Sequence, residues 1–237
     1  MGMGGPTAMT TGTCMSRPIR TTIPMTTDAV LTLTQWLSPG FPVGAYAYSH
    51  GLERVIEDGA MRDVQALELW LRDLIVVGGG RSDVVLLAAA YRAEPAMLPT
   101  VDAEARAFAA SAERRLETVQ QGVAFARSVD AIWGTALGPL TYPVAVGAAA
   151  RLQGFALELT ARMYLHAFAA NLISAAVRLV PLGQTEGQRL LAALAPLIHD
   201  TAAEAIETDI DDLTTACFAA DIAAMRHETQ YSKVFRT

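Results

Sequence analysis

The stretch from Arg151 to Arg178, RLQGFALELTARMYLHAFAANLISAAVR, decides the fold class of this chain. From Met163 to Val177 it contains no Asp, Glu, Lys or Arg. A helix that is apolar nearly all round is typical of an element buried at the centre of a bundle. The uncharged run is shorter than the roughly 20 residues that cross a membrane. We therefore expect one long helix over residues 143–178, buried at the centre of the protein.

Helical spacing of apolar residues continues on both sides of this stretch. Residues 64–74 place Leu and Val on one face, and Asp63 stands where it can cap the first turn. A second stripe covers residues 190–198, in which Pro196 is expected to kink or split the helix. Glycine and proline mark the joints between the expected helices, which are 28–37, 44–57, 63–77, 81–93, 101–111, 113–133, 143–178, 186–208 and 217–229.

Strand signals are scarce, so the fold is predicted to be all-α, a single-domain bundle of about eight to nine helices. We expect a disordered leader over 1–27, a helical domain over 28–224 and a partner-binding tail over 225–237. The leader has five Met but lacks the apolar run, roughly 7 to 15 residues long, of a secretory signal. A start of translation at a later methionine, such as Met25, is left open.

Composition excludes several function classes. The net charge of −6 argues against a general nucleic-acid binder, which needs a basic surface. Cys14 and Cys217 form no CxxC pair, so neither a disulfide scaffold nor a thiolate metal cluster is expected, and a cytoplasmic location fits best. Uncharged residues 131–150 are broken by prolines and are interpreted as core, so no membrane partner is expected. Only 18% of residues are charged, against roughly 25% in ordinary domains; partner-covered surface and high alanine use both explain this.

Catalytic motifs are weak. Residues 47–51, AYSHG, approach the GxSxG pattern of serine hydrolases, but that motif needs a strand before the serine and none is expected here. Ser49 is instead interpreted as a hydroxyl on a helix surface or in packing. Residues 78–82, GGGRS, match no phosphate-binding loop and are expected to form a flexible turn.

Metal ligands are also dispersed. The histidines are His50, His166, His199 and His227, and none has a second histidine three or four residues away. His50 and Glu53 are expected to share a helix face, but one such pair does not make a site. An acidic cluster is expected to be a solvated helix end and loop; it comprises Glu204, Glu207, Asp209, Asp211 and Asp212. We therefore expect no catalytic residue and no metal site, which favours an interaction role.

The C-terminal tail, 225–237, reads MRHETQYSKVFRT and differs sharply from the alanine-rich chain before it. Tyr231, Val234 and Phe235 would be exposed apolar groups there unless they dock. Tyrosine and arginine are favoured at protein interfaces, so the tail is a candidate contact surface. The alternative, that it packs back onto its own domain, is left open.

Three stretches together resemble the UreF family of urease accessory proteins. They are LSPGFPVGAYAYSHGLE at 37–53, NLISAAVRLVPLGQTEGQ at 171–188 and ADIAAMRHETQYSKVFRT at 220–237. The resemblance implies an all-helical, non-catalytic scaffold that dimerises, binds UreD (called UreH in some organisms), recruits the GTPase UreG and serves apo-urease. It implies that nickel and GTP act in that complex and that this chain binds no cofactor of its own. Modulation of GTP hydrolysis by UreG is a further implied role.

The resemblance also assigns candidate partner-binding residues by their match to the family's motifs. They are Tyr48, Ser49, His50, Glu53, Arg178, Gln184, Arg226, His227, Glu228, Tyr231, Ser232, Lys233, Phe235 and Arg236. Lys233 departs from the family's usual arginine, which keeps the charge but loses the planar two-pronged donor. Two other readings remain at this point. One is a helical metal-dependent enzyme that uses His50, Glu53 and His166, and the other is an unrelated helical adaptor.

Overall fold

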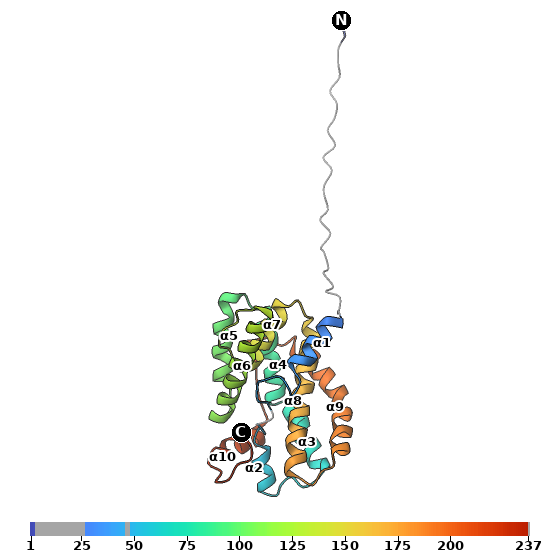
Figure 1. Ribbon diagram of the computed structural model, residues 1–237, viewed down its shortest axis with the longest axis vertical. Coiled ribbons are helices and arrows are strands. Elements are labelled where there is room, and N and C mark those ends of the chain that lie inside the picture. The colour runs from blue at the N-terminus through green and yellow to red at the C-terminus, as the bar shows by residue number, and fades with distance from the viewer. Residues whose placement is uncertain (3–26, 46–47, 237) are drawn as a thin grey trace.

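The computed structural model describes residues 1–2, 27–45 and 48–236, and within these ranges the regular structure is entirely helical. This confirms the predicted all-α, single-domain bundle (Figure 1). The α-helices are α1 (Thr27–Trp36), α2 (Leu52–Glu57), α3 (Val64–Val76), α4 (Gly79–Arg92), α5 (Leu98–Ala107), α6 (Ala112–Trp133), α7 (Tyr142–Leu152), α8 (Leu157–Leu179), α9 (Gln184–Ala205) and α10 (Phe218–His227). Short 3₁₀ turns at Pro95–Met97 and Ile210–Asp212 join α4 to α5 and lead from α9 toward α10.

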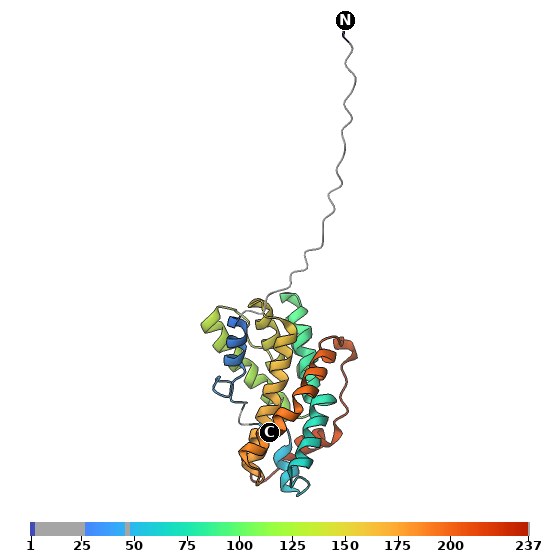
Figure 2. The same ribbon diagram turned by 90° about the vertical axis from the view of Figure 1, so that its right-hand side faces the viewer.

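The centre of the bundle is formed by α4, α7 and α8. Helix α4 packs most extensively against α7 and also against α8, while α8 contacts α9, α3, α2 and α1 (Figure 2). Alanine and glycine permit the close approach of α4 and α7, since a Cβ on Gly147 would lie 2.2 Å from the carbonyl oxygen of Leu87. Part of the high alanine content therefore serves close helix packing in the core.

The expected continuous helix over 143–178 is wrong, because it breaks between α7 and α8. Gly154 adopts a left-handed φ of 67°, and the Phe155 N–H bonds back to the carbonyl of Ala150. This is the usual way in which a glycine ends a helix. The apolar side chain of Phe155, 8% exposed, packs into the core at the break. The apolar pattern of the sequence therefore continues across the break and gives no sign of it. The expected central burial is confirmed for α7 and for one side of α8.

Two other local expectations are wrong, and a third, that Pro196 kinks or splits its helix, is wrong as far as splitting is concerned. The helix expected from 44 begins only at Leu52, because His50 and Gly51 have left-handed φ values of 52° and 78°. Gly79 and Gly80 belong to the first turn of α4 and are not a flexible turn. Pro196 does not split α9, whose apolar face packs into the core on both sides of the proline. Tertiary packing outweighs local preference at each of these positions.

One stretch has the length and hydropathy of a membrane span. It covers residues 64–92, and 67% of its most apolar window is buried within the protein. It comprises α3 and α4, which are separate elements of the bundle. This is the behaviour of core helices.

Candidate partner-binding surface

The carboxylate of Glu53 on α2 binds the backbone of the C-terminal tail. Its Oε1 accepts the Val234 N–H at 2.7 Å, and its Oε2 accepts the Phe235 N–H at 2.8 Å. Glu53 is only 6% exposed and Phe235 only 4% exposed. The tail therefore packs back onto its own domain in the isolated chain, which answers the alternative that the sequence left open.

His227, at the end of α10, connects the same carboxylate to α6. Its fully buried ring places Nε2 3.3 Å from Glu53 Oε2 and Nδ1 2.7 Å from Glu113 Oε2. The other oxygen of Glu113 accepts a hydrogen bond from Lys233 Nζ at 2.7 Å. Glu53, Glu113, His227, Lys233 and the two tail N–H groups form a closed set of contacts that we call the tail clasp.

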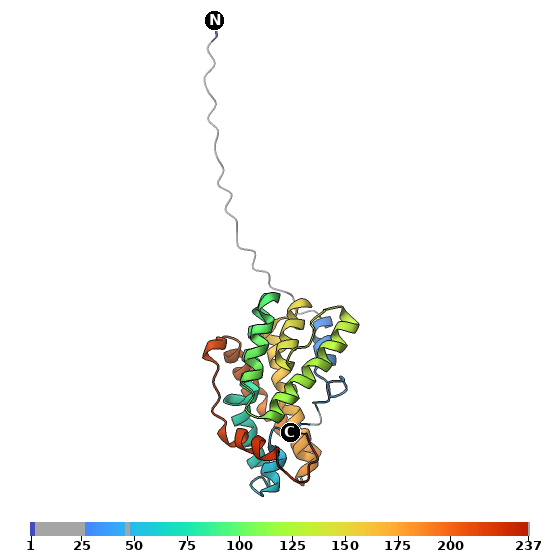
Figure 3. The ribbon, with the colours of Figure 1, turned by 90° about the vertical axis from the view of Figure 1, so that its left-hand side faces the viewer.

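Glu228 attaches the start of the tail to the first turn of α6. Its Oε1 accepts the Ala112 N–H at 2.8 Å, while the hydroxyl of Ser111 accepts the Arg114 N–H at 3.1 Å. The first N–H groups of a helix have no partner within the helix and attract negative charge. Glu228 accepts one of these N–H groups, and Glu113 places a negative charge in the first turn of α6. As a result, α10 and the tail are attached to α2 and α6 at one end of the bundle (Figures 1 and 3).

The docked tail and α10 leave apolar side chains facing solvent. Phe218, Ile222 and Met225 are 68%, 49% and 50% exposed, and their spacing of four and three residues puts them on one side of α10. In the tail, Tyr231 is fully exposed and Val234 is 74% exposed although the tail is docked, whereas Phe235 is buried. We call these five residues the outer apolar face. Exposed aromatic and aliphatic side chains on α10 and on the tail, with Arg226 and Arg236 also exposed, are typical of an interaction surface.

A second charged cluster lies inside the bundle, next to the tail clasp. His50 Nε2 lies 3.1 Å from Glu117 Oε1, and Arg114 Nη1 lies 2.8 Å from Glu117 Oε2. Arg114 Nη2 also lies 3.3 Å from Asp83 on α4, whose Oδ2 accepts the Tyr164 hydroxyl at 2.9 Å. We call these five residues the core ion cluster. Two cavities of about 60 and 40 Å³ adjoin it, which is room for a few water molecules but not for a substrate.

Burial disfavours ionisation of each charged member of the core ion cluster, and the neighbouring charges decide whether its pKa is finally raised or lowered. Burial raises the pKa of Glu117, but Arg114 and His50 overcome this and hold it at about 2. Burial dominates at Asp83, so its pKa lies above the ordinary value although Arg114 opposes the shift. Burial lowers the pKa of Arg114, but both carboxylates raise it to a net value above the ordinary one. Arg114 and Glu117 therefore form the permanent ion pair, and Asp83 is the acid that protonates more readily.

The residues of the N-terminal motif are mostly buried. Ser49 is fully buried and its hydroxyl accepts the Glu53 N–H at 3.3 Å, so it is a packing and capping hydroxyl and not a helix-surface one. Tyr48 is 5% exposed and its hydroxyl donates to Gln120 Oε1 at 3.1 Å. Burial raises the pKa of Tyr48, although the neighbouring Arg236 guanidinium opposes the shift. The tail thus reaches this motif at Glu53 and also at Tyr48.

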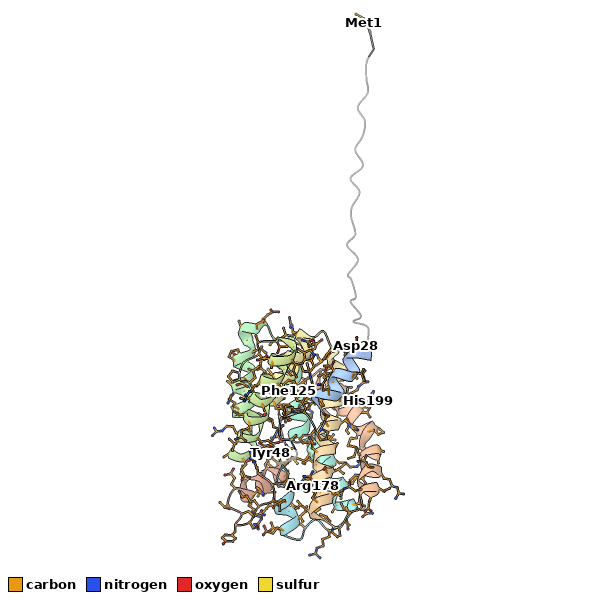
Figure 4. All side chains as sticks on the ribbon, viewed as in Figure 1. Met1, Asp28, Tyr48, Phe125, Arg178 and His199 are labelled. Carbon is orange, nitrogen blue, oxygen red and sulfur yellow. The ribbon has the colours of Figure 1, made fainter. Side chains whose placement is uncertain are left out.

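Arg178 and Gln184 lie at the junction of α8 and α9 and are both exposed. Arg178 donates to the Ser174 hydroxyl at 3.4 Å within its own helix. Figure 4 shows Arg178 at the same end of the bundle as α2, remote from Asp28 and His199. The motif residues therefore occupy two parts of the fold, namely the α8–α9 junction and the contact between α2, α10 and the tail.

The proposed metal-dependent enzyme does not fit the geometry. His50 contacts Glu117, Glu53 contacts His227 and the tail, and His166 is exposed on α8, where it lines a shallow hollow with His199. Within the described ranges, no group of three or more His, Cys, Asp or Glu side chains is arranged to hold a metal ion. The acidic cluster near the end of α9 is exposed as expected, with Glu204 and Glu207 paired to Arg81 and Arg92.

Sequence reasoning missed three charged side chains of α6 that take part in these clusters, namely Glu113, Arg114 and Glu117. One signal was present: Glu117 and Gln121 stand at four-residue intervals before Phe125 and Val129, and all four are buried. Polar residues in register with an apolar face are an indication of a buried network. The partners in α2 and the tail, by contrast, are far away in the chain and left no local signal.

Comparison with known proteins gives the family. A family model described as UreF matches residues 61–195. A urease accessory protein UreF from Roseobacter denitrificans is 68% identical over 90% of this chain and 96% of its own length. Proteins of the same name from a Ruegeria species and from Azorhizobium caulinodans are 58% and 47% identical, over 90% and 88% of this chain and 100% and 96% of their own lengths. The chain belongs to the UreF family.

Membership of the UreF family agrees with the sequence resemblance and with an accessory role, which is what the names of these relatives state. In this UreF-family chain the N-terminal stretch 37–53 and the C-terminal stretch 220–237 meet at Glu53 and His227.

Proposed function

We propose that this UreF-family chain is a scaffold in urease maturation, which joins UreD (UreH) and the GTPase UreG so that nickel is inserted into apo-urease. Nickel is cargo of the assembly, and GTP is bound by UreG. The scaffold acts in the cytoplasm as a homodimer, and its contact with UreG modulates GTP hydrolysis. The observation that carries this proposal is the outer apolar face, presented by α10 and the docked tail.

The chemistry of this face suits a protein partner. Phe218, Met225 and Tyr231 offer large apolar area, and Arg226 and Arg236 offer charged donors beside it. Aromatic, methionine and arginine side chains are the groups enriched at interfaces, and a few of them supply most of the binding energy. The proposed partner therefore presents an apolar groove with acidic groups at its rim.

Arg178 and Gln184 form a second, separate contact region in this proposal. Both are exposed where α8 passes into α9. Two regions on one chain are what a bridging protein or a dimer of bridging proteins requires. We propose that the outer apolar face receives one maturation partner and the α8–α9 junction another copy or partner.

The first test removes the tail. Deleting residues 226–237 from the full-length gene and co-purifying the product with UreD and UreG should abolish recovery of the complex. A matched control is Leu69→Ala, which removes an exposed apolar side chain, 65% exposed, from α3. Undiminished recovery by the deletion variant would rule out the proposed interface.

The second test concerns function in a urease-positive host. Deleting the gene should leave apo-urease at its normal abundance, with little nickel bound and little activity. Complementation with the full-length chain should restore both nickel content and activity. Normal activity without the gene would exclude a role in maturation.

A further inference from the structure

Helix α6 lies along the surface of the bundle (Figure 3), and the charged residues on its exposed side are all basic. The exposed positions of this helix are Ala112, Arg115, Leu116, Gln120, Val123, Arg127, Ala131 and Ile132. The acidic residues of α6 are engaged elsewhere, since Glu113 and Glu117 belong to the two clusters described above and Asp130 accepts the Leu137 N–H at 2.9 Å. The exposed side of α6 is therefore a local basic surface on a chain with a net charge of −6.

The guanidinium groups of Arg115 and Arg127 have no hydrogen-bond or ion-pair partner among the residues that the structure describes. Other surface arginines differ, because Arg54, Arg72 and Arg151 each pair with a nearby Asp or Glu. An arginine with no acidic partner on its own chain is available to a carboxylate of another protein. The two free cations stand twelve positions apart on one helix, which corresponds to about 18 Å along its axis.

A groove lies on α6 between these two arginines. Residues four apart on a helix form ridges, and the ridge of a second helix fits between two of them. One ridge of α6 carries Val119 and Val123, and the neighbouring ridge has the short side chains of Ala124 and Ser128. The hollow that they line has a volume of about 470 Å³, and Pro42 from the loop after α1 lines it as well. We call this hollow the α6 groove.

The surface in and around the α6 groove is largely apolar. Val123 is 41% exposed, and Leu116 and Ile132, one turn beyond the groove on either side, are 56% and 61% exposed. Apolar anchors that recur along a groove are the usual receptor for one face of an amphipathic helix. The distance between the two arginines corresponds to about three turns of such a helix. The shape and the polarity of the groove therefore suit a helix as its occupant.

The charge of this surface decides what kind of helix fits. Two copies of the same face would oppose arginine with arginine, because the exposed positions of α6 include no acid. A lipid surface or a nucleic acid calls for a larger basic cluster than Arg115 and Arg127 provide. An acidic protein segment satisfies both cations with two carboxylates and at the same time covers the apolar groove.

We propose that the α6 groove is a docking site for an acidic amphipathic helix of a partner protein. The apolar side chains of that helix pack against Val123 and Ala124, and its carboxylates pair with Arg115 and Arg127. The site goes beyond the scaffold role proposed above, since it uses neither the outer apolar face nor the α8–α9 junction.

The first experiment captures the partner helix in a urease-positive host. The full-length chain carries the photo-crosslinking residue p-benzoylphenylalanine in place of Val123. The control carries it in place of Leu69, which is 65% exposed on α3. Irradiation should give a discrete product at position 123 that the control lacks. Mass spectrometry should place the cross-link in an acidic segment whose apolar residues recur at helical spacing.

The second experiment tests the charges with the captured partner as a purified full-length protein. Arg127→Glu should weaken its binding at least about tenfold, because the substitution opposes two negative charges. Reversal of the facing carboxylate to lysine in the partner should restore binding to Arg127→Glu. Ala124→Leu, which fills the groove and alters no buried residue, should weaken binding by a similar factor. Arg72→Glu, on the exposed side of α3, is the matched control and should bind as the wild type does.

Urea denaturation midpoints establish that each variant folds, so a loss of binding can be assigned to the surface. Charge-dependent binding with rescue by the reversed partner would establish the site, whereas capture alone would not. The proposal is overturned if position 123 gives no product beyond that of the control, or if the product is another copy or another segment of this chain. It is also overturned if the captured segment lacks acidic residues or binds Arg127→Glu as tightly as the wild type.

Discussion

The core ion cluster and the tail clasp share two segments of chain, yet they differ in exposure and in the elements that they join. Residues 48–53 supply His50 to the core ion cluster and Glu53 to the tail clasp. The first turns of α6 supply Arg114 and Glu117 to the former and Glu113 to the latter. The core ion cluster joins α6 to α4 and α8, whereas the tail clasp joins α6 and α2 to a chain terminus.

The difference in exposure implies a difference in stability. Both clusters have a buried centre, since Glu117 is 3% exposed and His227 is fully buried, but Lys233 of the tail clasp is 27% exposed whereas Arg114 of the core ion cluster is 15% exposed. A buried charge that loses its partner is costly, so the core ion cluster forms or fails with the whole fold. A terminus held by a few contacts near solvent can open locally without global unfolding. The same two segments thus support the core ion cluster, which we call the permanent joint, and the tail clasp, which we call the releasable joint because it can open without global unfolding.

The sharpest test of the permanent joint is Arg114→Met. It keeps an unbranched apolar stem but leaves Asp83 and Glu117 buried without the guanidinium that pairs with both. We expect a loss of about 3–5 kcal/mol in the free energy of unfolding, measured by urea denaturation. The control is Arg115→Met, at the exposed neighbouring position on α6. Equal midpoints for the two variants would contradict the structural role of the cluster.

The pH dependence of the core ion cluster gives the next largest effect. The folded pKa of Glu117, about 2, lies below its ordinary 4.5, so its ionised form stabilises the fold above pH 4.5. This contribution, on the order of 3 kcal/mol, is lost as pH falls from 4.5 toward 2. The gap in melting temperature between wild type and Glu117→Gln should therefore narrow as the pH is lowered below 4.5.

Two further variants serve as a control and as a comparison for this pH prediction. Glu57→Gln, on the exposed side of α2, should show no such narrowing. Asp83 has a raised pKa, so protonation stabilises the fold and Asp83→Asn should cost less at pH 7 than Glu117→Gln. A gap for Glu117→Gln that widens toward low pH would show that Glu117 is not the stabilising carboxylate.

The helices could be predicted from the sequence because their information is local. Apolar spacing located α3, α6 and α10 closely, and the uncharged run at 163–177 identified the central helix. The break at Gly154 was missed because Phe155 is apolar and buried and so continued the apolar pattern. The late start of α2 was missed because His50 adopts a left-handed φ, which non-glycine residues rarely do.

The candidate site could be predicted only in part. Motif matching selected Glu53 and His227, but nothing in the sequence indicated that their side chains lie 3.3 Å apart, since that contact joins α2 to α10. Glu113 was missed because an acidic residue in the first turn of a helix is usually explained by the helix dipole. Long-range pairing is a property of the folded chain, and local patterns do not encode it.

Phe235→Ala tests the releasable joint. The ring is 4% exposed, as buried as many core residues, but it belongs to a segment that can detach as a unit. We therefore expect a loss of at most about 1–2 kcal/mol in global stability, because undocking limits the cost, together with loss of amide protection at 234–235. Phe125→Ala, at a fully buried position on α6, should cost about 3–5 kcal/mol in the same urea assay.

A loss at Phe235 as large as that at Phe125 would mean that the tail and the bundle unfold as one cooperative unit. The distinction between the two clusters would then disappear. A small loss with full retention of amide protection would instead show that the hydrogen bonds to Glu53 suffice to hold the tail.

The smallest effect on stability is expected at Tyr231, where the effect on binding should be large. Its side chain is fully exposed, so Tyr231→Ala should change the free energy of unfolding by less than about 0.5 kcal/mol. If the tail clasp serves to present this side chain, UreD binding should weaken about tenfold, the size of an interface hot-spot residue. The exposed residue Leu69 on α3 supplies the control, since Leu69→Ala should affect neither quantity. Unchanged UreD binding by Tyr231→Ala would show that Tyr231 does not contact UreD. The tail clasp would then have no role in UreD binding through Tyr231, because ordering the tail affects binding only if a residue of the tail makes contact.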